Sequence, residues 1–208
     1  MQYKQLIEIS LRPLNASARE AMLKKEAWGR NQIRRRLPVH PLTGNETDGQ
    51  AHILRVDGLV RNRLALSLAD LERLPQAQLT DDFTCLEGWS VPRVRWSGVL
   101  LKTVLSLAEP RPEACYVQAS AANFSLPVTL ERAEQALLAI RLSEALVPPE
   151  HGGAVRLVLP GGECFTSIKW LEHLELLDQP GKNTAKEIAA ERLPAKQSYT
   201  SSGGNRPR

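Results

Sequence analysis

The chain has 208 residues, a length that suits one domain, and its 42% hydrophobic and 24% charged residues are typical of a globular protein. No apolar run approaches the roughly 18 residues that a membrane-spanning helix needs. The first nine residues carry charges where a signal peptide requires an apolar segment. We therefore expect no membrane span and a cytoplasmic protein.

Basic residues gather toward the two ends, although the formal net charge is only +4. Residues 1–36 carry nine Lys or Arg and three Glu, and residues 193–208 carry three basic residues and no acid. Charged polar ends are typical either of solvated tails or of segments that bind anions or nucleic acid. A solvated tail is expected at 193–208, and both alternatives stay open for 1–36. Nucleic-acid binding is the weakest function hypothesis, because aromatic residues are not interleaved with the basic ones.

The first 50 residues are expected to form a basic arm that packs on the domain. Within it, residues 17–25 predict one short helix, and residues 37–49 are rich in turn formers. The domain itself is expected over residues 51–180, beginning with a strand at 52–58. A helix follows at 67–74, where Ser67 and Asp70 have the spacing of a capping box and Pro75 ends the helix.

The remaining elements mix short strands and short helices. Strands are predicted over 78–84, 115–119, 137–142 and 154–159, helices over 97–108 and 129–136, and an alternating segment over 170–177. Residues 181–208 are expected to hold a terminal helix and a tail that is disordered from 194 onward. Because there is no regular strand–helix period and no repeat, the chain is expected to be an α+β domain with a mixed sheet.

The three cysteines are an odd number and include no Cys-x-x-Cys pair, which supports neither a disulfide framework nor a zinc site. Cys85 lies where a predicted strand meets a Gly/Pro loop, so its thiolate could face a cleft as a metal ligand or nucleophile. The alternative is a small buried side chain. Burial is the expectation for Cys115, in an apolar strand, and for Cys164, in a turn.

A second group of polar residues follows a glycine-rich turn. Arg156 lies inside an apolar strand, where a charge is costly unless it meets a partner. Lys169 follows the hydroxyl residues Thr166 and Ser167, and hydroxyls, backbone amides and two cations together make a plausible phosphate site. The alternative is that Arg156 pairs with an acid and Lys169 is a solvated strand residue.

Five motifs, taken in order, resemble the molybdopterin-binding domain of the sulfite oxidase family. They are TCLEGWS at 84–90, VRWSGVLL at 94–101, Tyr116-Val117, HGGAVRLVLP at 151–160 and TSIKW at 166–170. The likeness covers roughly residues 50–178 and is closer to the catalytic subunits of bacterial protein-methionine-sulfoxide reductases. It implies a mixed-sheet α+β fold of the sulfite oxidase type.

The resemblance also implies a cofactor, molybdopterin carrying molybdenum or tungsten, and residues that hold it. Cys85 corresponds to the thiolate that ligates the metal, which makes it the catalytic residue. The positions that would contact the rest of the cofactor are Asn31, Arg34, Arg35, His151, Arg156, Ser167, Ile168 and Lys169.

The expected function is that of a molybdenum-dependent oxidoreductase that transfers an oxygen atom to or from a sulfite- or sulfoxide-type substrate. Electrons would be exchanged with a redox partner that the sequence does not identify. Arg93, Arg95 and Asn123 are candidates for orienting the substrate. The alternative from another class is a non-catalytic module that binds or carries molybdopterin.

Overall fold

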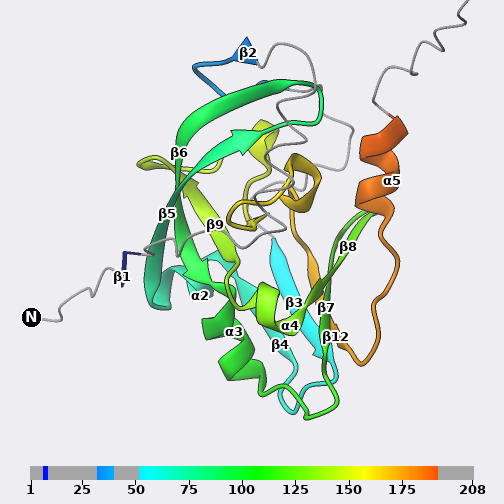
Figure 1. Ribbon diagram of the computed structural model, residues 1–208. Helices are drawn as coiled ribbons and strands as arrows, with labels where there is room; N and C mark the ends of the chain where they lie inside the picture. Colours follow the sequence, from blue (N-terminus) through cyan, green and yellow to red (C-terminus); the bar gives the residue numbers. More distant parts are fainter. Residues whose placement is uncertain (1–6, 9–31, 40–51, 192–208) are drawn as a thin grey trace, which may run out of the picture.

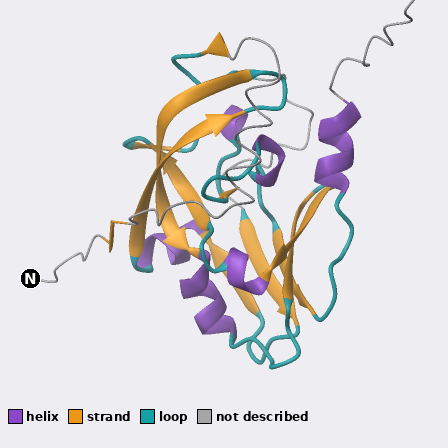
Figure 2. Cartoon of the chain, viewed as in Figure 1, coloured by secondary structure: helices purple, strands orange, loops and turns teal. Residues whose placement is uncertain are grey.

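Two β-sheets and a few short helices make up the part of the chain that the computed structural model describes, residues 7–8, 32–39 and 52–191 (Figure 1). Strands dominate this architecture, and the helices lie around them (Figure 2). The α+β class with mixed sheets is therefore confirmed. No helix of the described residues is long and apolar enough to cross a membrane.

The first sheet is built around a long, curved hairpin of β5 and β6 (Figure 1). Its backbone path within the described residues is β1-β5-β6-β9-β10, with β11 paired to β9 and β2 paired to β6. The strands are β1 (Ile7–Glu8), β2 (Gln32–Ile33), β5 (Gln76–Thr84), β6 (Trp89–Leu100), β9 (Leu137–Leu142), β10 (Ala145–Leu146) and β11 (Arg156–Val158).

The second sheet has the order β4-β3-β12-β7-β8. Its strands are β3 (Ile53–Gly58), β4 (Leu64–Ser67), β7 (Tyr116–Ala121), β8 (Phe124–Thr129) and β12 (His173–Leu177). The central strand, β12, runs parallel to β3 and antiparallel to β7. Chain segments far apart in the sequence therefore meet in this sheet.

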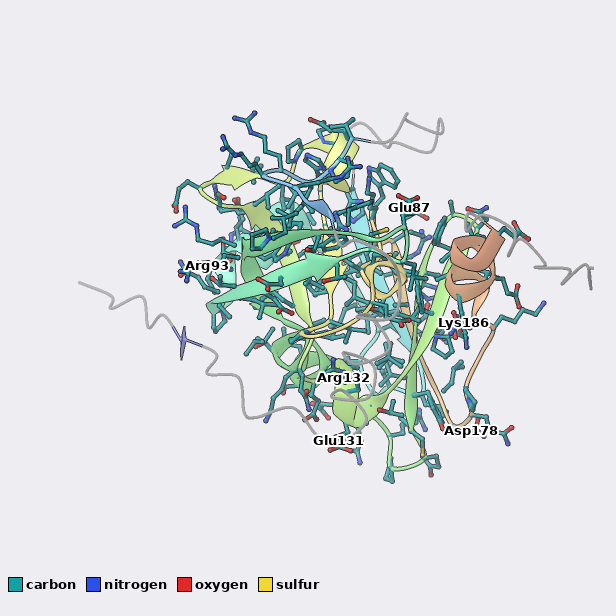
Figure 3. All side chains as sticks on the ribbon, turned by 45° about the horizontal axis from the view of Figure 1, so that its top comes forward. Glu87, Arg93, Glu131, Arg132, Asp178 and Lys186 are labelled. Atoms are coloured by element: carbon teal, nitrogen blue, oxygen red, sulfur yellow. The ribbon has the colours of Figure 1, made fainter. Side chains whose placement is uncertain are left out.

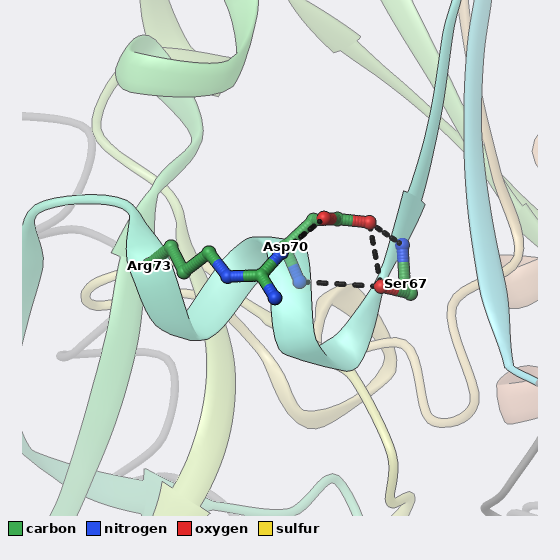
Figure 4. A network of polar contacts seen from close by, with 3 residues as sticks. All are labelled: Ser67, Asp70 and Arg73. Atoms are coloured by element: carbon green, nitrogen blue, oxygen red, sulfur yellow. Dashed lines mark hydrogen bonds and ion pairs between the residues drawn. The ribbon is translucent and has the colours of Figure 1, made fainter.

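Short helices connect and flank the strands. They are α2 (Leu68–Arg73), α3 (Leu101–Ala108), α4 (Leu130–Ala133), α5 (Thr184–Glu191) and the 3₁₀ turns η1 (Pro149–His151) and η2 (Cys164–Thr166). The predicted capping box of α2 is confirmed: Asp70 N–H donates to Ser67 Oγ at 3.2 Å, and Ser67 N–H donates to Asp70 Oδ2 at 3.0 Å (Figure 4). Arg73 extends this network with a 3.0 Å ion pair to Asp70.

The helix expected over 97–108 begins only at Leu101, because residues 97–100 complete β6 and pair with β9. Val99 and Leu100 belong to the apolar pattern that suggested a helix, but strand pairing decides their conformation. Gly98 permits the close approach of these strands, since a Cβ there would lie 2.0 Å from the carbonyl oxygen of Leu138. The helix expected over 129–136 is likewise reduced to the single turn α4.

The core has two parts, and β9 separates them. Leu138 and Ile140 face the larger cluster, which joins both sheets, whereas Leu137 and Ala139 face the smaller cluster around β5 and β6. A strand buried on both faces has a continuous apolar run, which is why 137–142 was predicted correctly.

The proposed division into arm, domain and tail stays a prediction. Most of residues 1–50, including the helix predicted at 17–25, lies outside the described residues, as does the chain after residue 191. The two described pieces of the arm, β1 and β2, pair in parallel with β5 and β6.

Candidate functional site

A cavity of about 210 Å³ lies where the loop after β5, the turns η1 and η2, and the helix α5 come together. Its polar and sulfur-bearing lining residues are Cys85, Glu87, Asn123, His151, Arg156, Cys164, Ser167, Lys169 and Glu172. Its larger apolar and aromatic lining residues are Leu37, Phe83, Leu86, Trp89, Phe124, Phe165, Trp170 and Ile188. The cavity therefore joins sulfur, positive charge and apolar walls.

Cys85 is held at the turn between β5 and β6. Its N–H donates to Trp89 O at 2.9 Å, and its carbonyl oxygen accepts from Gly88 N–H at 3.1 Å. The neighbouring residue in space is Cys164, whose Sγ accepts from the Leu86 N–H at 3.5 Å. The Cys164 side chain, followed by burial, raises the pKa of the Cys85 thiol. The Cys85 side chain in turn lowers the pKa of Cys164.

Arg156 is the buried cation of the site, with only 3% of its surface exposed. It donates from Nε to Ser167 Oγ and from Nη1 to His151 O, both at 2.8 Å. Its guanidinium also lies over the rings of Phe83 and Trp96, at 5.2 and 5.1 Å from the centroids. Burial lowers the pKa of Arg156 to about 10.

The expected alternative, an acid paired with Arg156, is not found: the described residues include no ion pair between Arg156 and a carboxylate. A guanidinium buried without a carboxylate leaves its positive charge available to an anionic ligand. The geometry therefore favours an anion site over a structural ion pair.

The loop around Arg156 brings three more predicted residues to the cavity. Lys169 Nζ donates to Glu150 O at 2.7 Å and lies 5.3 Å from the centroid of the Trp170 ring. His151 is the last residue of η1. Its pKa is lowered mainly by burial and further by the nearby charges of Lys169 and Arg156. Ser167 completes the group through its bond to Arg156.

Ile168 and the arm residues are placed differently. The Ile168 side chain belongs to the main core and does not line the cavity, so this residue would have to act through its backbone. Arg34 lies with its guanidinium 5.4 Å from the centroid of the Trp89 ring, and neither Arg34 nor Arg35 lines the cavity, although Leu37 does. Asn31 lies outside the described residues.

Two of the three substrate candidates lie away from the cavity. Arg93 is exposed at a bend of β6, where its N–H donates to Asp82 at 2.8 Å, and Figure 3 shows it apart from Glu87, which lines the cavity. Arg95 faces solvent and pairs with Glu144 at 3.8 Å. Asn123 does line the cavity.

The expectation that both remaining cysteines are buried in the core is wrong. Cys115 is exposed, because it precedes β7 with its side chain directed away from the core. Cys164 lines the cavity beside Cys85. The sequence carries no local signal for this pairing, since the two residues meet only through the folding of the chain.

Comparison with known proteins matches residues 41–185 to the oxidoreductase molybdopterin binding domain. An uncharacterized oxidoreductase, YuiH of Bacillus subtilis, is 33% identical over 125 residues, which cover 59% of this chain and 63% of YuiH. The protein-methionine-sulfoxide reductase catalytic subunit MsrP of Campylobacter jejuni is 27% identical over 154 residues, 64% of this chain and 52% of MsrP. The chain thus spans about half to two thirds of these relatives.

A solved structure supports the same assignment. The sulfane dehydrogenase SoxCD of Paracoccus pantotrophus superposes with a TM-score of 0.59 at 25% identity, over 65% of this chain and 40% of the SoxCD chain. The fold is therefore the sulfite-oxidase-type fold that the motifs implied, and the cofactor of the family is molybdenum-bearing molybdopterin. The chain belongs to the oxidoreductase molybdopterin binding domain family.

Proposed function

We propose that this protein is an enzyme that transfers an oxygen atom at a molybdenum centre whose protein ligand is the Cys85 thiolate. The supporting observation is that Cys85 and the buried Arg156, which are far apart in the sequence, line one cavity. A thiolate is a soft ligand suited to a redox-active metal, and a guanidinium is suited to a phosphate group. The two ends of molybdopterin, its metal and its phosphate, need these two chemistries.

The residues present fit that cofactor. The described residues include no group of three or more His, Cys, Asp or Glu that could hold a metal, so most ligands must arrive with the cofactor. The indole Nε1 of Trp170, a cavity-lining residue, is buried without a hydrogen-bond partner among the described residues and can donate to a bound group. A Cβ at Gly152 would lie 2.7 Å from Lys169 Cβ, so glycine there lets the lysine stem lie against the loop.

When bound, the cofactor supplies the two-electron redox chemistry. The protein holds and orients it: Cys85 would bind the metal, which keeps the thiol deprotonated. Arg156 and Lys169 would bind the phosphate, with Ser167 fixing the guanidinium in place. The aromatic side chains of the cavity, Phe124 among them, would exclude water from the reacting atoms.

For the substrate we propose a neutral sulfoxide rather than an inorganic anion such as sulfite. Two carboxylates, Glu87 and Glu172, line the cavity and would repel an anion, and Glu87 is held by a 2.9 Å bond from Trp89 Nε1. Arg93 and Arg95 lie outside the cavity. Asn123 lines the cavity, and its side-chain amide would donate to a sulfoxide oxygen. A separate redox partner would deliver the electrons.

The metal-ligand assignment is tested with Cys85→Ser, with Cys115→Ser as the matched control because Cys115 is exposed and outside the cavity. We expect Cys85→Ser to remain folded and to lose redox activity, because a hydroxyl is a harder ligand than a thiolate. Cys115→Ser should keep both molybdenum and activity. Elemental analysis for molybdenum and tungsten accompanies the assay, and full turnover by Cys85→Ser would exclude the assignment.

The substrate proposal is tested by offering the metal-loaded protein methionine sulfoxide with a reduced viologen dye, and sulfite with an oxidised dye. We expect turnover with the sulfoxide and little with sulfite. The reverse preference would contradict the proposed substrate class. A loaded protein that is inert toward every oxygen donor and acceptor would instead support a non-catalytic molybdopterin carrier.

A further inference from the structure

A second thiol lies beside the proposed metal ligand. Cys85 and Cys164 both line the cavity, and both are partly buried. The backbone of the residue after Cys85 also contacts the second sulfur, since Leu86 N–H donates to Cys164 Sγ at 3.5 Å. We propose that Cys85 and Cys164 form a reversible disulfide in the cofactor-free protein, which closes the metal site.

The local backbone can accommodate this bond. Cys85 lies in the turn between β5 and β6, and Cys164 begins the short turn η2, so neither is fixed within a strand or a long helix. A disulfide requires the two Cβ atoms to come within about 3.5–4.5 Å. The contact with the Leu86 N–H already holds the Cys164 sulfur against the backbone next to Cys85. The cavity itself gives small oxidants access to both sulfurs.

The reaction is an exchange with a low-molecular-weight disulfide such as oxidised glutathione. One cysteine thiolate attacks it, forms a mixed disulfide and releases one glutathione thiolate, which takes up a proton. The second cysteine then displaces the other glutathione, and its proton passes to that leaving thiolate. The protein loses two electrons and two protons, and one glutathione disulfide takes them up to become two thiols.

The consequence for the site rests on the proposed function, in which Cys85 binds the metal. A sulfur bonded to Cys164 has no thiolate to offer, so the oxidised protein should not accept molybdenum. Conversely, Cys85 bound to the metal is not available to Cys164, so the loaded protein should resist the same oxidant. The pair would therefore respond to oxidant only before the cofactor is inserted.

The test uses the full chain produced without cofactor and treated with oxidised glutathione, then alkylated, digested and analysed by mass spectrometry. We expect a cross-linked peptide that joins residues 85 and 164, with Cys115 alkylated, and the same result for Cys115→Ser. In Cys85→Ser, glutathione should stay attached to Cys164, because no second thiol displaces it. Folded wild-type protein that stays alkylatable at both Cys85 and Cys164 would overturn the proposal.

A second measurement separates this inference from the proposed function. Oxidised and reduced wild-type protein are incubated with molybdenum-bearing molybdopterin, and the bound molybdenum is measured. We expect the oxidised protein to bind none until dithiothreitol opens the disulfide. If the cross-link forms and molybdenum is bound equally well, closure of the site and Cys85 ligation both fail; if the cross-link does not form, only the disulfide fails.

Discussion

A single guanidinium carries the strongest electrostatic argument for the site. Arg156 is buried, is held by Ser167 and by the carbonyl oxygen of His151, and meets no carboxylate among the described residues. A structural role would normally supply an acid, because an isolated buried charge is costly. The free-energy cost of burying the Arg156 guanidinium is explained if its partner is the phosphate of the cofactor.

An arginine that serves the phosphate should matter little for the stability of the cofactor-free protein and should be required for binding the cofactor. Arg156→Met should change the stability of the cofactor-free form by no more than about 1–2 kcal/mol, since an apolar residue of similar length replaces an unpaired charge. It should also strongly lower the molybdenum content. The control is Arg141→Met, which removes a half-exposed arginine paired with Glu72. Urea denaturation and elemental analysis measure the two effects, and unchanged molybdenum content would contradict the phosphate assignment.

His52 gives a prediction for pH. It is 5% exposed, and burial is the main cause that lowers its pKa from the ordinary 6.5. The unfolded chain therefore binds this proton more readily than the folded one, so stability falls as the pH drops below about 6.5. We expect His52→Gln to lose less stability than wild type between pH 7 and pH 5 in urea denaturation. Parallel losses in the two proteins would exclude His52 as the cause.

Helices and strands were predicted best from the sequence where their residues interact with near neighbours in the chain. The capping box of α2 was predicted from Ser67 and Asp70 alone, and β9 from its apolar run. The start of α3 was predicted wrongly, because residues 97–100 pair with β9, a segment about forty positions away. The strand β8 was also missed, since Pro127 argues against a strand and is tolerated only because β8 lies at the sheet edge.

The capping box can be measured directly. Ser67→Ala should cost about 1 kcal/mol, the typical loss for an N-cap serine. Hydrogen bonds from Ser67 lower the pKa of Asp70 below its ordinary 3.8, so the contribution of Asp70 is present above that pH and is lost as the pH falls further. Ser106→Ala, which removes an exposed hydroxyl inside α3, is the control. Equal losses from the two substitutions in denaturation at pH 7 would contradict the cap assignment.

Over the whole molecule, the site is assembled from segments that local patterns cannot bring together. The motifs indicated Cys85, Arg156 and Lys169, and all three line the cavity. Cys164 and Ile188 were not predicted as site residues, because only tertiary packing places η2 and α5 beside the turn that holds Cys85. The helix α5 is attached to the second sheet through Thr184, which donates to Asn123 O at 2.7 Å and accepts from Ser125 N–H at 2.9 Å.

Loosening this attachment should expose the cavity without unfolding the domain. Thr184→Val removes both hydrogen bonds while keeping the shape of the side chain, so we expect faster amide exchange over residues 184–191 and little change elsewhere. Hydrogen–deuterium exchange with mass spectrometry measures this. Thr129→Val, which removes the cap of the short helix α4, is a control that should leave α5 unaffected. Slow exchange of α5 in Thr184→Val would show that other contacts hold it.

The position of β12 has a consequence for how the protein is made. This strand is the middle one of its sheet, yet it follows every other strand of the described chain in the sequence. While a ribosome is still adding residues up to about 177, β3 and β7 have no neighbour between them, and their inner edges stay open to wrong pairings. Completion of this sheet must therefore wait for almost complete translation of the domain, and a chaperone that shields these edges would raise the yield of folded protein.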